Sequence, residues 1–217
     1  MTSFWSFLAW VAASPASRVA RPLYAVAAGR DVVRTPDKQN AALGVQLRWP
    51  VSENDAVYPA LAVANFILGY GGDSRLWKRI REREGLSYGV WSSVDWGDVD
   101  VHSVWSGTAI FAPGNGDKVE AAFREEVARA LRDGFTEAEV ISARQALLNF
   151  RRLARAQDER LAQGLVRNLE RNRTFEFAAQ VDQAIARLSA SQVNRTLRTH
   201  LKPDAMVFVL AGDFKEP

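Results

Sequence analysis

The stretch that decides the fold of this chain is residues 71–90, which read Gly-Gly-Asp-Ser-Arg-Leu-Trp-Lys-Arg-Ile-Arg-Glu-Arg-Glu-Gly-Leu-Ser-Tyr-Gly-Val. The first part predicts a short charged helix, which Gly85 is suited to end because glycine readily adopts positive φ. The Leu-Ser-Tyr sequence that follows predicts entry into a strand. Arg81 and Tyr88 are therefore expected on either side of one turn.

Alternating apolar residues and turn formers predict five strands. The predicted strands are residues 30–34, 41–48, 86–96, 99–111 and 205–211. The first two look like an antiparallel start to a sheet. The third and fourth read as a hairpin with a tight turn near Gly97-Asp98.

Helical periodicity and capping residues predict six helices. They are residues 52–68 with Ser52 as cap, about 74–83 capped by Asp73 or Ser74, 117–132 ended by Gly134, 136–171, 174–188, and 191–201 capped by Ser189 or Ser191. The fourth begins with the capping-box pair Thr136 and Glu139 and is long enough to expect a kink or break. Strands and helices are segregated along the chain, which predicts an α+β fold with helices packed on a mostly antiparallel sheet.

The run from Ser74 to Tyr88 resembles a signature of the M16 (insulinase or pitrilysin-like) zinc peptidases. The matching residues are Ser74-Arg-Leu, Arg81-Glu82 and Gly85-Leu-Ser-Tyr88, with weaker support from Asp37-Lys38 and Asn65–Gly69. The resemblance covers about residues 21–214. It implies the C-terminal, non-zinc-binding type of M16 domain at residues 21–217, after a linker or N-terminal appendage at residues 1–20.

The chain lacks the zinc motif that M16 enzymes use for hydrolysis, which is His-x-x-Glu-His plus a distal Glu. Its two histidines, His102 and His200, are far apart and have no matching Glu. Two ligands on one helix face need short spacing, so we expect solvated or hydrogen-bonded imidazoles. The resemblance therefore implies no metal or other cofactor in this chain and zinc in a partner half.

Arg81 and Tyr88 are the candidate site residues. In M16 enzymes, an Arg and a Tyr at this spacing reach the bound peptide from the half that closes over the metal. A phenol and a guanidinium are donors suited to a developing oxyanion or to substrate carbonyls. The alternatives are a surface ion pair of Arg81 with Glu82 or Glu84, and a half-buried strand aromatic at Tyr88.

The resemblance thus implies the non-catalytic half of a metallopeptidase, with a zinc-bearing M16 domain or subunit and a peptide as partners. Self-association is expected when that partner is absent. The alternative is a structural or assembly protein on the same fold, like the core subunits of respiratory cytochrome complexes.

Composition sets wider limits. The 217 residues carry a formal charge of +3 and no cysteine, which excludes disulfides and thiolate chemistry. The apolar run at residues 4–13 is too short to span a bilayer and has no preceding Lys or Arg. A linker is favoured over a leader or anchor there, and both the periplasm and the cytoplasm of a bacterium remain open.

Two compositional features could belong to a binding surface. Eight arginines lie between residues 144 and 173, against three acids and one aromatic, Phe150. Without interleaved aromatics we expect no nucleic-acid partner, but a solvated face on a chamber wall that would favour acidic peptides.

Trp91, Trp96 and Trp105 in the hairpin are expected in the core or an interface, or else as an apolar wall beside Tyr88. Gly69, Gly71 and Gly72 read as a turn between helices, since no Gly-Lys-Ser/Thr follows to make a phosphate loop.

Overall fold

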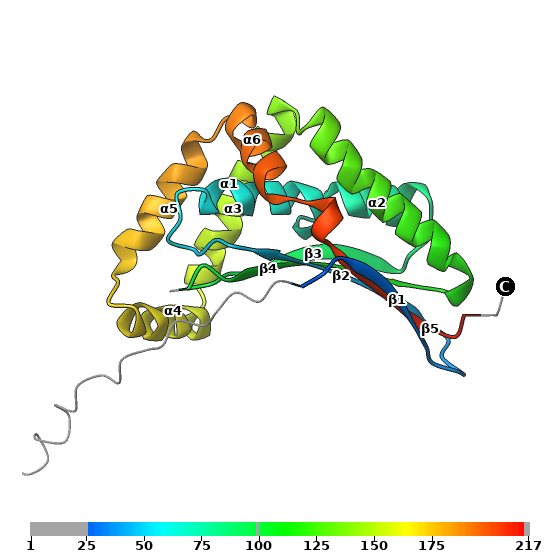
Figure 1. Cartoon of the computed structure of the whole chain (residues 1–217). Helices are drawn as coiled ribbons and strands as arrows, with labels where there is room; N and C mark the ends of the chain where they lie inside the picture. The colour runs from blue at the N-terminus through cyan, green and yellow to red at the C-terminus, as the bar shows by residue number, and fades with distance from the viewer. Residues whose placement is uncertain (1–25, 99, 215–217) are drawn as a thin grey trace, which may run out of the picture.

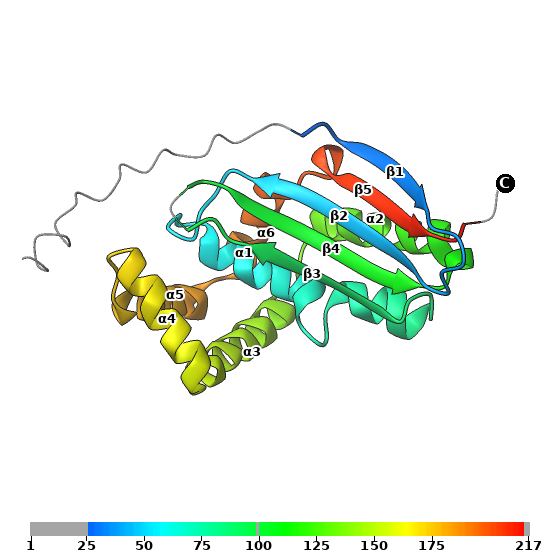
Figure 2. The same cartoon turned by 90° about the horizontal axis from the view of Figure 1, so that it is seen from below.

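The computed structural model describes residues 26–98 and 100–214, which form two layers. One layer is a five-stranded sheet, and helices cover one of its faces (Figure 1). The described part of the chain leaves the opposite face bare, as the view from below shows (Figure 2). The α+β prediction is confirmed. The predicted linker at residues 1–20 lies outside the described residues.

The sheet has the strand order β1-β5-β2-β4-β3, and only β1 and β5 pair in parallel. The strands are β1 Gly29–Arg34, β2 Ala41–Trp49, β3 Gly89–Asp95, β4 Ser103–Phe111 and β5 Val207–Gly212. The expected pairing of the first two strands is wrong, because the C-terminal strand β5 lies between them. Sequence adjacency favours a hairpin, but a strand distant in sequence took the place beside β2.

The helices agree with the predicted segments except at several ends. They are α1 Tyr58–Asn65, η3 Phe66–Tyr70, η4 Trp77–Arg83, η5 Pro113–Asn115, α2 Gly116–Asp133, α3 Glu137–Arg155, α4 Asp158–Glu170, α5 Phe175–Arg187, α6 Ala190–His200 and η6 Pro203–Ala205. The long predicted helix divides into α3 and α4 at Gln157, whose backbone is extended, so the expected break is present.

Capping predictions had mixed outcomes. Thr136 and Glu139 form the predicted capping box of α3, and Ser189 caps α6 in the same way. Ser52 does not cap α1: its N–H and hydroxyl bond Asp55 instead, and the helix begins at Tyr58. Neither Asp73 nor Ser74 makes a side-chain cap on the second helix, since Ser74 Oγ is buried without a hydrogen-bond partner and Asp73 pairs with Lys78.

The hairpin is also less regular than expected. β3 ends at Asp95 and β4 begins at Ser103, so the predicted tight turn is wrong and His102 precedes the strand. This loop is tied back to the core, because Ser103 Oγ donates to the Val51 carbonyl and accepts from Gly97 N. A hydroxyl serving both sides of the loop favours the wider connection over a two-residue turn.

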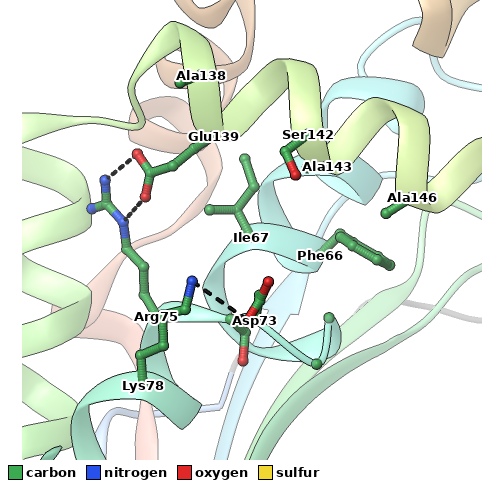
Figure 3. Close-up of a pocket in the computed structure, with 13 residues that line it drawn as sticks. Phe66, Ile67, Asp73, Arg75, Lys78, Ala138, Glu139, Ser142, Ala143 and Ala146 are labelled. Atoms are coloured by element: carbon green, nitrogen blue, oxygen red, sulfur yellow. Dashed lines mark hydrogen bonds and ion pairs between the residues drawn. The ribbon is translucent and has the colours of Figure 1, made fainter.

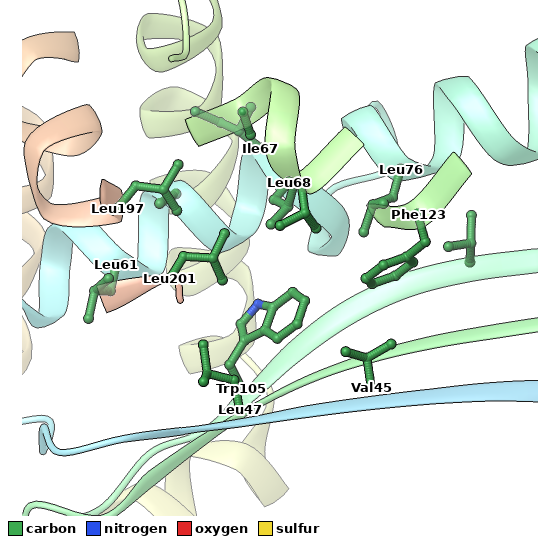
Figure 4. Close-up of a cluster of buried hydrophobic side chains, with 14 of the residues drawn as sticks. Val45, Leu47, Leu61, Ile67, Leu68, Leu76, Trp105, Phe123, Leu197 and Leu201 are labelled. Atoms are coloured by element: carbon green, nitrogen blue, oxygen red, sulfur yellow. The ribbon is translucent and has the colours of Figure 1, made fainter. Parts of the chain in front are cut away.

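The core lies between the sheet and the helices (Figure 4). Its centre is Trp105, fully buried beside Phe123 on α2. The indole N–H of Trp105 donates to Asn65 Oδ1 at 2.9 Å, and Ser92 Oγ donates to the same oxygen at 2.7 Å. One amide oxygen thus satisfies two buried donors and joins α1 to β3 and β4.

Candidate functional site

Arg81 lies on η4, a π-helical segment that is exposed except at Ile80 and the partly buried Trp77 and Arg79. Its guanidinium sits over the ring of Trp77, 6.0 Å from the centroid, as residues four apart on a helix can. Among the described residues Arg81 has no carboxylate partner. The alternative considered from the sequence, an ion pair of Arg81 with Glu82 or Glu84, is not formed. Glu84 binds Arg79 and Arg83 instead, and Glu82 accepts a hydrogen bond from the Trp77 indole.

Tyr88 lies immediately before β3 and is 62% exposed. Its backbone N–H donates to the Ile110 carbonyl of β4 at 2.8 Å, which fixes the main chain while leaving the ring free. The neighbouring Ser87 is buried, and its hydroxyl donates to the carbonyls of Gly89 and Ile110. The alternative that Tyr88 is a half-buried strand aromatic is therefore wrong. Its side chain is exposed, and its backbone is held by the hydrogen bond to β4.

Both residues lie next to unusual helical backbone. Two π-helical segments, η3 and η4, follow one another, and such segments are rare and often found at functional sites. Gly69 of η3 packs so closely on β3 that a Cβ there would lie 2.4 Å from Ser92 Oγ. Gly85 ends η4 with φ of +61°, as predicted. The contact of Gly69 with Ser92 thus fixes η3 against the middle of β3.

A hollow of about 550 Å³ lies behind η4, between the Gly71–Ser74 turn and α3 (Figure 3). Arg75 and Glu139 form a two-bond ion pair at one side, with Nε–Oε1 and Nη2–Oε2 distances of 2.7 and 2.8 Å. Partial burial raises the pKa of Glu139, but hydrogen bonds from Arg75 and Thr136 outweigh it and lower the pKa to about 2. The pair therefore stays ionised and joins the residues just before η4 to the first turn of α3.

The histidines do not come together. His102 lies between β3 and β4, and its buried Nδ1 has no hydrogen-bond partner among the described residues. His200 Nδ1 is 2.9 Å from the Thr196 carbonyl oxygen. The described residues contain no group of three or more His, Cys, Asp or Glu side chains arranged to hold a metal ion. These described residues do not provide the ligand set of a zinc site.

The hairpin tryptophans divide between core and surface. Trp105 is buried, and Trp96 packs against Trp49 and edge-on against Tyr58 at 4.7 Å. Only Trp91 is exposed, at 40%, on the bare face of the sheet. The alternative that the three tryptophans form an apolar wall beside Tyr88 is therefore wrong. Successive side chains of a strand point to opposite faces, so Trp105 faces the core and Trp91 faces solvent.

Four of the eight arginines of the basic stretch form ion pairs with described carboxylates. Arg151 and Arg155 bind Asp182, while Arg171 and Arg173 bind Glu53. Burial raises the pKa of Tyr58, which lies near this cluster, although Arg151 opposes the change. The ion pairs to Asp182 connect α3 to α5, and those to Glu53 connect the residues after α4 to the loop before α1.

The sequence did not point to Trp77 as the platform under Arg81, or to Glu139 as the partner of Arg75. The four-residue spacing of Trp77 and Arg81 was a usable signal. The Arg75–Glu139 pair spans 64 positions, and only the tertiary structure places the residues before η4 beside the start of α3. Within the described residues, no helix is long and apolar enough to cross a bilayer.

Comparison with known proteins gives a consistent family. The model described as "Peptidase M16 inactive domain" matches residues 5–147. An uncharacterized zinc protease of Mycobacterium leprae is 39% identical over 89 residues, which cover 41% of this chain and 19% of that protein.

Solved structures show the same fold. The M16 inactive domain from Pseudomonas fluorescens superimposes with a TM-score of 0.82 at 22% identity, over 94% of this chain and 48% of that one. A protease from Helicobacter pylori gives a TM-score of 0.77 at 16% identity, over 94% of this chain and 47% of its own. The chain therefore spans about half the length of these two relatives and about a fifth of the curated one.

Proposed function

Because this chain belongs to the Peptidase M16 inactive-domain family, we propose that it is the non-catalytic half of a zinc metallopeptidase. In this proposal it closes on a zinc-bearing M16 domain or subunit, and Arg81 and Tyr88 contact the peptide. The observation that carries the proposal is the state of these two side chains. Both belong to the family signature, both are exposed, and Arg81 lacks a carboxylate partner among the described residues.

The chemistry suits the two residues. Zinc bound in the partner would supply the activated water for peptide hydrolysis. Attack on the peptide carbonyl develops negative charge on its oxygen, and donors fixed in advance stabilise that charge most. The pinned backbone of Tyr88 and the Trp77 platform under Arg81 reduce the reorganisation that each donor needs. Arg81 would bind the oxyanion or a neighbouring carbonyl.

The partner would also cover an apolar surface. Leu165, Val166 and Leu169 lie along one side of α4 and are 45%, 53% and 80% exposed. Exposed apolar side chains grouped on one helix indicate a contact surface. The relatives extend over about twice the length of this chain, so the other half of the enzyme is the proposed occupant.

The test is kinetic and uses the complex. A zinc-bearing M16 subunit encoded beside this chain would be purified with it, and kcat and KM measured on a quenched fluorescent peptide. Tyr88→Phe keeps the ring and removes the donor, so a loss of about 10²- to 10³-fold in kcat is expected if the phenol binds the oxyanion. A loss confined to KM would place it on ground-state carbonyls.

Arg81→Ala is compared with Arg83→Ala, an exposed arginine two residues further along the same helix. We expect activity to fall only in the Arg81 variant, with unchanged melting of both chains. Wild-type kinetics in the Tyr88 and Arg81 variants would contradict the proposal. Unchanged assembly with no peptidase activity in any complex would favour the structural or assembly role.

A further inference from the structure

A second hollow, of about 530 Å³, is lined by the end of β3 and by residues of α3, α4 and α5. We name it the arginine pocket, because six arginines line it: Arg151, Arg155, Arg160, Arg167, Arg171 and Arg173. Glu53 and Asp95 are the acids in its lining. Figures 1 and 2 show α4 at one end of the layer of helices, and residues 160–168 of this helix contribute to the lining.

Four of these arginines have carboxylate partners, as described above, and two do not. Arg160 and Arg167, both exposed, have no ion-pair partner among the described residues. They are seven residues apart on α4, which places them on the same side of the helix and about 10 Å apart along its axis. Arg160 and Arg167 therefore present two positive charges to the pocket that no described carboxylate neutralises. Asp95, at the end of β3, is the opposing charge.

The pocket is poorly suited to stacked bases. Arg173 covers one face of Phe177 at 4.0 Å, and Trp96 is packed against Trp49 and Tyr58. Phe150 meets Tyr70 edge-on at 5.9 Å. Single-stranded nucleic acids are held largely by stacking on free aromatic faces, and most aromatic side chains here already have neighbours. Carboxylates need only the guanidinium groups.

The position of the pocket relates it to the proposed substrate path. Tyr88 precedes β3 and Asp95 ends it, so the two ends of the strand are about 20 Å apart. An extended peptide that contacts Tyr88 and runs beside β3 would reach the pocket after about six residues. An acidic side chain at that distance would meet Arg160 or Arg167.

We infer that the arginine pocket binds an acidic segment of the peptide substrate, about six residues from the bond that is cleaved. That the bound peptide is a substrate rests on the proposed function, but the binding of an acidic peptide to the pocket does not need the partner. Two solvent-exposed ion pairs, one with Arg160 and one with Arg167, should make a carboxylate peptide bind about three- to tenfold more tightly than its amide analogue.

The test measures binding to the full chain alone by fluorescence anisotropy. The probes are three fluorescein-labelled decapeptides that differ only in carrying Glu, Gln or Lys at alternate positions, and a ten-nucleotide oligothymidine. We expect the Glu peptide to bind tightest and to lose this advantage at high salt. In Arg160→Gln/Arg167→Gln the preference for Glu over Gln should disappear.

The matched control is Arg152→Gln/Arg187→Gln, which removes two exposed arginines of α3 and α5 that do not line the pocket. It changes the net charge equally and should keep the preference. Equal binding of the Glu and Gln peptides, or equal loss in both double variants, would overturn the inference. Oligothymidine binding as tight as the Glu peptide, and dependent on Arg160 and Arg167, would assign the pocket to nucleic acid instead. Inactive complexes with intact Glu preference would refute the proposed function alone.

Discussion

Replacing Glu139 by Gln tests how much the ion pair with Arg75, which joins the residues just before η4 to α3, stabilises the fold. Glu139 receives two hydrogen bonds from Arg75 and two from Thr136, whose N–H and Oγ1 lie 2.7 and 2.9 Å from Oε2. Gln can still accept in a capping box, so the substitution mainly removes the charge.

The magnitude follows from the pKa of Glu139, which is lowered from 4.5 to about 2. At about 1.36 kcal/mol per pKa unit, this corresponds to about 3.4 kcal/mol of stabilisation at neutral pH. The side chain is 32% exposed, and solvent screening reduces the figure by about half. We therefore expect Glu139→Gln to lower the free energy of unfolding by about 1.5 to 2 kcal/mol, or Tm by about 3 to 8 °C.

The loss should depend on pH in a defined direction. Because the pKa of Glu139 is lower in the folded state, its contribution is complete above about pH 5 and is lost as the pH falls from 4.5 towards 2. The stability difference between wild type and Glu139→Gln, measured by urea unfolding, should thus shrink to less than half between pH 7 and pH 3.

Two controls separate this pair from helix-end effects. Glu176→Gln removes a carboxylate from the first turn of α5 and should cost only a few tenths of a kcal/mol. A double-mutant cycle of Arg75→Gln with Glu139→Gln should give a coupling of about 1 kcal/mol or more. An unchanged free energy of unfolding in Glu139→Gln, or a difference that does not vary with pH, would refute the argument.

Two further predictions concern the scaffold. Gly69→Ala places a Cβ 2.4 Å from Ser92 Oγ and 2.7 Å from its backbone N, so we expect a loss of about 1 to 3 kcal/mol in urea unfolding. Gly72→Ala, where a Cβ meets nothing within 4 Å, is the control, and equal effects would contradict the close-packing account. Asn65→Ala leaves the buried donors of Ser92 and Trp105 without an acceptor and should cost about 2 to 4 kcal/mol. A melting temperature within 2 °C or so of wild type would show that water replaces the amide.

The candidate site was only partly accessible from sequence. The spacing of Arg81, Gly85 and Tyr88 located both candidates, because it depends on one local helix, one turn and one strand entry. The ion pairing around Arg81 was not accessible, since three acids and four cations near it allow many combinations. The structure resolved this by giving Glu84 to Arg79 and Arg83 and leaving Arg81 over Trp77.

The sequence alone determined the elements and the class. Apolar periodicity, the capping pairs at α3 and α6, and glycines at Gly85 and Gly134 act within a few residues, so they are legible without a fold. The absence of a zinc motif was equally determined, because two distant histidines cannot provide it.

Tertiary structure alone decided what depends on contacts between distant segments. It inserted β5 between β1 and β2, and it broke the long helix at Gln157. It also paired four arginines with acids from other elements while leaving Arg160 and Arg167 unpaired in the described residues. The physical reason is that strand order and ion-pair choice are set by burying the whole apolar surface at once, and local propensities do not encode that competition.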